Sequence, residues 1–327
     1  MFYLENERLR VEIEKPGTLY KGSRFDWTGF ISQITLDGTV TYCVPEQLEE
    51  GKGTGGLGFC NEFGIDKPVG YDAVDAGDVF PKIGVGLLKK EQESDYDFFK
   101  SYDVAPAKVE IREAADSVMF ETTDNSSSGY GYHLVKEVAI KDNKLIISYQ
   151  LTNTGKYSLH TNEYCHNFIG INDQFIDEHY QLTMPRMKAI DVAVGSIQRS
   201  KDELSWPDTP EADFYAAIDW DLDNGTYNWE VYNDAVKAGV RELSEFKPSK
   251  VALWGYRHVV CPEVFIAIDL KADEKKSWQR VYEFYQKNEA MMKTCRHSPL
   301  KGLELTLKAN LSADFPDVDC TCNRYTI

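Results

Sequence analysis

The stretch Tyr132–Gly155, YHLVKEVAIKDNKLIISYQLTNTG, has the two-residue periodicity of β-strands. Within Lys144–Thr152, every second residue from Leu145 onward is large and apolar, as expected for a strand that buries one face. His133–Ile140 has the same pattern, and the turn residues Asp142-Asn143 separate the two segments. The stretch therefore predicts two strands joined by a short turn.

The same alternation recurs along the chain, in Lys108–Arg112, Val118–Thr122 and Gly302–Leu311. An apolar face at helical spacing predicts a helix over Ser277–Met292, and a shorter helix is expected near Asn228–Ala238. No repeat of fixed period and no Pro/Ser-rich linker divides the sequence. Many short strands with few short helices predict an all-β fold, a large antiparallel sandwich formed by residues 1–327 as a single domain.

Net charge narrows the classes of partner. The 327 residues contain 36 Lys and Arg against 53 Asp and Glu, which gives a formal net charge of −17 at pH 7. Nucleic acids and anionic membrane surfaces repel such a chain, so neither is expected as a partner. The opening stretch MFYLENERLRVEIEK is charged throughout, and no long apolar run follows. The sequence therefore predicts a cytoplasmic protein without a membrane span.

Cysteine and glycine patterns argue against a metal or a nucleotide cofactor. The seven cysteines are dispersed and form no CxxC pair, which disfavours a structural zinc site and favours reduced thiols. Cys320 and Cys322 leave metal binding or oxidation open near the C-terminal end. Gly51–Gly64 lacks the ending of a phosphate-binding loop, and is expected to be a flexible loop or one that approaches other groups closely.

The segment Ser158–Asp173, SLHTNEYCHNFIGIND, is polar where a core strand should be apolar. If the segment is extended, one face carries His160, Asn162, Tyr164, His166 and Phe168, and the other carries Thr161, Glu163, Cys165 and Asn167. A buried polar row is costly unless its members are paired or used in function. The segment is therefore either part of a functional site or an edge strand with solvated side chains.

A second unusual segment, Val251–Leu270, places Glu263 between two apolar runs. A carboxylate in so hydrophobic a segment meets a cation, has a functional role, or faces solvent at a strand end. Pro262 marks a bulge, a strand end or an edge. Arg257 and His258 are close enough in sequence for an ordinary ion pair with Glu263.

Three stretches resemble the aldose 1-epimerase (galactose mutarotase-like) superfamily. Tyr132–Gly155 is similar to paired strands that precede the family's catalytic histidine, HNFIGIND at His166–Asp173 is similar to the histidine element, and VCPE at Val260–Glu263 resembles the segment with the catalytic glutamate. Phe168-Ile169 replaces a usual Tyr-Phe, and Pro262 replaces an apolar residue, so the chain resembles a divergent branch. The resemblance implies a large antiparallel β-supersandwich.

The resemblance also implies an isomerase that interconverts sugar anomers by general acid–base catalysis without a cofactor. Glu263 is expected to be the base and His166 the acid, with His160 or Glu163 as alternatives for the acid position. The reference pKa of histidine suits that role, and the acidic chain is expected to favour the charged imidazolium. Residues expected to bind the sugar are Asn162, Asn167, Trp254, Arg257 and Arg24.

The expected ligand is a small-molecule carbohydrate. A phosphorylated sugar would call for a cluster of Arg and Lys residues, which the sequence does not reveal, so an uncharged aldose or a derivative is favoured. Two other functions stay open: a carbohydrate-binding protein without catalysis, and a glycoside hydrolase or lyase on a similar sandwich. A hydrolase would draw two carboxylates from Asp219, Asp221, Glu163 and Glu263.

Overall fold

A computed structural model of the chain describes residues 1–125, 128–221 and 228–287. Met1–Lys287 forms one compact unit. The strand expected at Gly302–Leu311 and the pair Cys320 and Cys322 lie outside the described residues. A single domain extending through residue 327 therefore stays a prediction.

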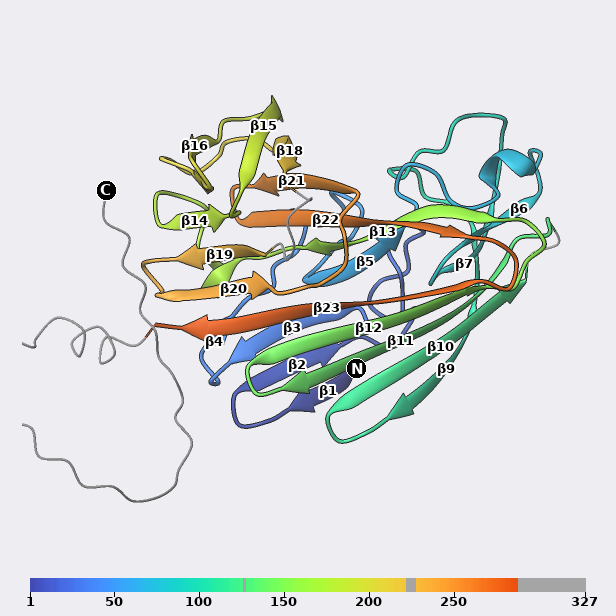
Figure 1. The fold of residues 1–327 in the computed structure, drawn as a ribbon, viewed down its shortest axis with the longest axis horizontal. Coiled ribbons are helices and arrows are strands. Elements are labelled where there is room, and N and C mark those ends of the chain that lie inside the picture. The colour runs from blue at the N-terminus through green and yellow to red at the C-terminus, as the bar shows by residue number, and fades with distance from the viewer. Residues whose placement is uncertain (126–127, 222–227, 288–327) are drawn as a thin grey trace, which may run out of the picture. The chain divides into compact units, whose positions relative to one another are not determined.

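Two large antiparallel sheets make up most of the described chain (Figure 1). The first sheet contains, in spatial order, β1 (Phe2–Glu5), β2 (Leu9–Ile13), β3 (Ile31–Leu36), β5 (Phe59–Phe63), β13 (Leu159–Asn167), β22 (Val259–Leu270), β21 (Lys250–Tyr256), β18 (Phe214–Trp220) and β15 (Met187–Val194), with β4 (Val40–Thr41) beside β3. The second contains β16 (Gln198–Ser200), β17 (Glu203–Ser205), β14 (Tyr180–Thr183), β19 (Trp229–Asn233), β20 (Ala238–Glu242), β23 (Lys275–Gln286), β12 (Lys144–Asn153), β11 (Gly131–Lys141), β10 (Ser117–Asn125) and β9 (Lys108–Glu113).

Smaller elements complete the unit. A three-stranded sheet consists of β6 (Val79–Lys82), β7 (Gly86–Lys89) and β8 (Val104–Pro106). Two single 3₁₀ turns, Tyr71–Ala73 and Ile171–Asp173, are the helical elements of the described residues. The predicted all-β antiparallel sandwich, including the β11–β12 hairpin around Asp142-Asn143, is thereby confirmed.

Both predicted helices are wrong. Residues 277–286 belong to β23, in which Trp278, Arg280, Tyr282 and Phe284 are buried at every second position. The segment near Asn228–Ala238 contains β19 and the start of β20. In β23 the outward residues Val281 and Tyr285 are also apolar, so apolar residues occur at spacings that fit both a helix and a strand. Pairing with β12 and β20 selects the strand.

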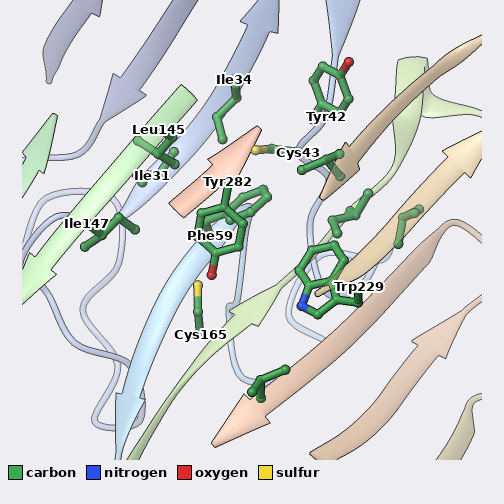
Figure 2. Packing of buried hydrophobic residues seen from close by; sticks show 14 of the residues in the cluster. Ile31, Ile34, Tyr42, Cys43, Phe59, Leu145, Ile147, Cys165, Trp229 and Tyr282 are labelled. Carbon is green, nitrogen blue, oxygen red and sulfur yellow. The ribbon is translucent and has the colours of Figure 1, made fainter. Parts of the chain in front are cut away.

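The main hydrophobic core lies between the two large sheets (Figure 2). Phe59 of β5 and Cys165 of β13 face Leu145 and Ile147 of β12 and Tyr282 of β23. Strand alternation turns the neighbours of Cys165, namely Tyr164 and His166, to the opposite face of the first sheet. The polar residues of β13 are thus divided between the core and the opposite face of the first sheet.

A chain of buried charged groups crosses this core. Arg280 donates from Nη2 to Glu163 Oε2 and from Nη1 to Glu242 Oε1, both at 2.9 Å. Asn61 Nδ2 donates to Glu163 Oε1 at 2.7 Å, and Lys136 Nζ donates to Asn61 Oδ1 at 2.6 Å. Because each charge has partners, these groups can stay in the core.

The opposite face of the first sheet is covered by a second apolar cluster. Phe168, which follows β13, packs there with Cys60 and Cys261 of the first sheet and with Phe80 and Leu88 of the three-stranded sheet. The Gly-rich stretch passes beside this cluster: a Cβ on Gly56 would lie 2.3 Å from the Phe168 ring, and one on Gly58 would lie 2.2 Å from the Ile31 carbonyl oxygen. The expected close approach is therefore present, although residues 59–63 form β5 instead of loop.

Candidate functional site

His166 and Glu263 meet on the covered outer face of the first sheet. Nε2 of His166 lies 3.1 Å from Oε1 of Glu263. His166 is 4% exposed and Glu263 is 5% exposed. A solvent-facing Glu263 is therefore excluded, and so is a role for β13 as a solvated edge strand, because β13 lies between β5 and β22.

An opening in the backbone ladder brings the two side chains opposite each other. The pairing of β13 with β22 ends at Glu163–Ile266 and resumes at the bridge Ile169–Val260. Continuing the register between these points sets His166 across from Glu263. Pro262, which lacks an N–H, lies in this opening, and its carbonyl oxygen accepts a 2.7 Å hydrogen bond from Asn167 Nδ2. Pro262 thus lies where backbone pairing between β13 and β22 is interrupted, within an interior strand of the sheet.

Aromatic rings surround the imidazole of His166. The ring of Phe168 is stacked on it at 3.9 Å between centroids, and Phe25 lies edge-on at 5.9 Å. Trp254 of β21 lies edge-on at 5.5 Å, and the ring of Tyr164 is tilted at 5.8 Å. These contacts restrict the orientation of the imidazole and exclude water from it.

Burial favours the uncharged forms of both groups. Burial lowers the pKa of His166 well below its usual value, and the nearby Arg24 charge lowers it further. Burial raises the pKa of Glu263 to about 8, although the charge of Arg24 opposes that shift. The expectation of a charged imidazolium is therefore wrong, because local desolvation outweighs the net charge of the chain.

Arg24 reaches the site through a buried network that also contains Glu62 and Lys82, two residues absent from the sequence-based site prediction. Its Nε donates to Glu62 Oε2 at 2.9 Å, and its Nη2 donates to the Tyr164 hydroxyl at 3.0 Å. Lys82 Nζ donates to the other Glu62 oxygen at 3.1 Å. The one sequence signal for Glu62 is a carboxylate in the apolar strand segment FCNEF. Nothing local marks Lys82, whose strand β6 is far from β13 in sequence.

The remaining predicted sugar-binding residues divide into two groups. Trp254 is partly buried beside His166, and Asn162 is partly buried on β13, with its Nδ2 3.3 Å from Asp66 Oδ2. Asn167 faces away from His166 and supports Pro262 instead. Arg257 is exposed, and its guanidinium lies over the Phe175 ring at 4.8 Å. The structure therefore does not bring Asn167 or Arg257 to the pair.

His160 and Glu163, the two alternatives for the acid position, interact with other residues and not with Glu263. His160 is exposed, lies 2.7 Å from Asp269 through Nδ1, and lines a separate hollow of about 290 Å³. Glu163 faces the core and is held by Arg280. His258, considered as an ion-pair partner for Glu263, has its Nε2 2.8 Å from the Pro45 carbonyl oxygen.

A hollow of about 840 Å³ lies away from the catalytic candidates. Among its lining residues, Val135, Ser148 and Gln279 are on the outward face of the second sheet. Size alone does not make this hollow the active site, because neither His166 nor Glu263 lines it. The functional assignment rests instead on the buried acid–base pair.

Two further questions concern metal-ligand clusters and membrane-spanning helices among the described residues. These residues contain no group of three or more His, Cys, Asp or Glu side chains arranged to hold a metal ion. The four described cysteines are buried free thiols, among them Cys60 and Cys261 beside the site. Within the described ranges, no helix has the length and hydropathy needed to cross a bilayer.

Comparison with known proteins identifies the fold. No protein-family model matches the sequence, and no curated protein does. The structure is similar to that of a galactose mutarotase related enzyme from Lactobacillus acidophilus, with 12% identity, 88% of this chain and 98% of that chain covered, and a TM-score of 0.57. A galactose mutarotase-like protein from Lactobacillus casei matches with 12% identity, 87% and 100% coverage, and a TM-score of 0.55. One from Clostridium acetobutylicum matches with 11% identity, 88% and 94% coverage, and a TM-score of 0.50. This chain therefore has the galactose mutarotase-like fold.

Proposed function

We propose that this protein is a mutarotase that interconverts the α and β anomers of an aldose through the open-chain aldehyde. The observation that carries the proposal is the direct contact between His166 and Glu263 at 3.1 Å in a buried, aromatic-lined position. A histidine and a carboxyl in contact can exchange protons with two oxygens bonded to one carbon. The fold shared with mutarotase-related structures supports this reaction class.

Ring opening requires two proton transfers. A base removes the proton of the anomeric hydroxyl as its oxygen forms the carbonyl, and an acid protonates the ring oxygen as its bond to the anomeric carbon breaks. Rotation about the adjacent carbon–carbon bond then presents the other face of the aldehyde. The reverse transfers close the ring as the opposite anomer. The cycle consumes no cofactor and leaves the protein unchanged.

The pKa values of the pair determine which group starts as the acid. With the pKa of Glu263 near 8 and that of His166 lowered, the carboxyl holds the proton at neutral pH and the imidazole is free to accept one. Glu263 then protonates the ring oxygen while His166 takes the hydroxyl proton, which reverses the roles expected from the sequence. Ring closure returns both protons and restores the pair.

The charges around the pair favour an uncharged sugar. Arg24 and Lys82 both bind Glu62, and Arg24 also lies 4.0 Å from Glu46. A phosphate or carboxylate on the substrate would have to displace these partners in a buried network. We therefore assign a neutral aldose or derivative as the substrate, in agreement with the uncharged sugar favoured by the sequence.

Two rival functions make different demands on the site. A glycoside hydrolase needs a second carboxyl beside Glu263. Glu163 faces the core, and Glu62 is held between two cations. Asp219 lies in β18 and Asp221 follows it, and β21 separates that strand from β22, so none of these carboxyls lies beside Glu263. A protein that binds sugar without catalysis would not require an acid and a base in contact. If the protein bound a sugar but did not accelerate anomer exchange, sugar binding without catalysis would be its function.

The test is anomer exchange measured by saturation-transfer NMR across a panel of neutral aldoses. Glu263→Gln and His166→Asn should each lower kcat by roughly 10²–10⁴-fold, the usual contribution of an acid or base. His160→Asn, an exposed change on the same strand, serves as the matched control and should retain the wild-type rate. Wild-type exchange in either site variant would refute the pair, and sugar binding without exchange by the wild type would refute the enzyme.

A further inference from the structure

Lys82 is a fully buried cation that takes no part in the proton transfers. It lies in β6 of the three-stranded sheet, which covers the outer face of the first sheet, and its side chain is 0% exposed. Its Nζ has three oxygen atoms as neighbours: Glu62 Oε1 at 3.1 Å, the Tyr96 hydroxyl at 3.3 Å and the Gly64 carbonyl oxygen at 3.4 Å. Three acceptors match the three N–H donors of an ammonium group, so the geometry favours a charged Lys82.

Glu62 is shared between this lysine and Arg24. Its Oε1 accepts from Lys82, and its Oε2 accepts from Arg24 Nε at 2.9 Å and from the Tyr164 hydroxyl at 2.7 Å. Glu62 pairs with Tyr164 in the register of β5 and β13, and His166 lies two residues further along the same face of β13. One carboxylate therefore binds two cations, and one of these, Arg24, acts on the acid–base pair.

The balance of buried charges near the pair depends on Lys82. Arg24 and Lys82 are the cations of this set, and the anions are Glu62 and Glu46, whose Oε1 lies 4.0 Å from Arg24 Nη1. The set is neutral while Glu263 holds its proton. Without Lys82 the set would carry a net negative charge, which opposes ionisation of a nearby carboxyl and favours protonation of a nearby imidazole.

The other titratable groups that face the pair do not supply this charge. Lys250 of β21 lowers the pKa of Glu263, but Lys250 is exposed and its Nζ lies over the Phe265 ring at 4.8 Å. The remaining neighbours are hydroxyl and thiol groups whose pKa values are raised by burial, so they are uncharged at neutral pH: Tyr164, Tyr215, Cys60 and Cys261.

We propose that Lys82 is a positioning residue for the proton transfer at His166 and Glu263, acting through Glu62. By binding Glu62 from the covering sheet, Lys82 leaves part of the Arg24 charge uncompensated, and that charge acts on the pair. The inference rests on the proposed function and adds the three-stranded sheet to the unit that performs it. Loss of the Lys82 charge should make both members of the pair bind protons more tightly.

The experiment follows the Glu263 carboxyl carbon by NMR titration, in parallel with pH profiles of kcat/KM. Lys82→Gln removes the charge but keeps a donor for Glu62, and Lys82→Met removes both. Each should raise the pKa of Glu263, and with it the high-pH limb of the rate, by roughly 0.5–1 pH unit, as expected for one charge lost about 10–15 Å away inside a protein. Lys82→Arg keeps the charge and should keep the wild-type values.

Lys136→Gln is the matched control. Lys136 is also a fully buried lysine with a carboxylate partner, Asp26 at 3.2 Å, but it lies in β11 and faces the core between the two large sheets. Burial already raises the pKa of Asp26, so Asp26 takes up a proton when Lys136 is replaced, and the net charge stays the same. The control should lower the melting temperature and leave the pKa of Glu263 unchanged.

The NMR titration separates failure of this inference from failure of the proposed function. A raised Glu263 pKa in Lys82→Gln and Lys82→Met, absent in Lys82→Arg and Lys136→Gln, supports the role of the Lys82 charge even if the wild type accelerates no anomer exchange. An unchanged Glu263 pKa in the two charge-removing variants, or an equal rise in Lys136→Gln, would overturn the inference even if mutarotase activity is found. Circular dichroism verifies folding, and if one charge-removing variant does not fold, the other decides.

Discussion

The imidazole of His166 lies flat against the ring of Phe168, with centroids 3.9 Å apart and planes 8° from parallel. His166 is in the last part of β13, and Phe168 follows two residues later, just beyond the end of the strand. Residues two apart in extended chain lie on the same face. Stacking restricts rotation of the imidazole and keeps its Nε2 directed at Glu263. In the proposed mechanism, Phe168 is thus a positioning residue for the proton-transferring pair.

Replacing this ring should weaken the alignment of His166. Phe168→Leu removes a stacking contact of about 0.5–1.5 kcal/mol, so kcat should fall by up to roughly tenfold with little change in KM. Phe284→Leu, a buried change in the core between the sheets, is the control and should reduce stability without lowering kcat in the folded enzyme. An equal loss of kcat in both variants would argue against a positioning role.

The stability of the fold should depend on pH through Glu263. The pKa of this carboxyl is about 8 in the folded protein and near 4.5 when unfolded, so the folded state binds the extra proton between these values. Ionising Glu263 therefore costs stability progressively from about pH 4.5 to about 8. Glu263→Gln removes that cost, and its melting temperature should rise relative to wild type between pH 5 and pH 9. A constant difference across this range would contradict the raised pKa.

The rate should have a bell-shaped dependence on pH. Activity falls at high pH when Glu263 loses its proton, with a midpoint near 8 in the free enzyme, and at low pH when His166 becomes charged. Because the Arg24 charge lowers both pKa values, Arg24→Gln should move both limbs to higher pH. Profiles of kcat/KM measure this, with Arg24→Lys as the charge-retaining control. If both limbs of the kcat/KM profile of Arg24→Gln stayed at their wild-type pH, the effect of the Arg24 charge on the two pKa values would be refuted.

The buried ion network should be a major contributor to stability. Arg280→Leu leaves Glu163 and Glu242 without their shared cation, and should lower the free energy of unfolding by about 3–5 kcal/mol. The exposed pair of Arg8 and Asp37 provides the comparison, because Arg8→Leu should cost about 0–1 kcal/mol. Urea denaturation distinguishes the two. Similar losses in both variants would mean that the core network adds little.

The sequence predicts the strands and the location of the pair because both leave local patterns. Alternation in β12 identifies the sandwich, and a polar residue within an apolar run identifies Glu263. Alternation also assigns Asn167 to the face opposite His166, so the structural role of its amide agrees with the pattern of β13 and disagrees with the expected sugar contact. A residue on the wrong face of a strand cannot share a site with its neighbour.

The parts that sequence could not predict depend on distant contacts. Arg24 and Glu62 are 38 positions apart, and Arg24 and Tyr164 are 140 apart, so no local pattern joins them. The protonation of the pair likewise depends on burial by residues from several strands. The sequence predicts a helix where β23 forms because the apolar residues satisfy two periodicities, and pairing with β12 and β20 selects the strand.

The open ladder between β13 and β22 has a mechanical consequence. Where two strands are joined by backbone hydrogen bonds, their separation is held near 4.8 Å, and opposite side chains cannot move apart freely. At His166 and Glu263 the strands are linked instead by the side-chain bond from Asn167 to Pro262. Local bending can therefore widen the distance between imidazole and carboxyl and admit an anomeric carbon with its two oxygens, while the ladders to β5 and β21 keep the sheet intact.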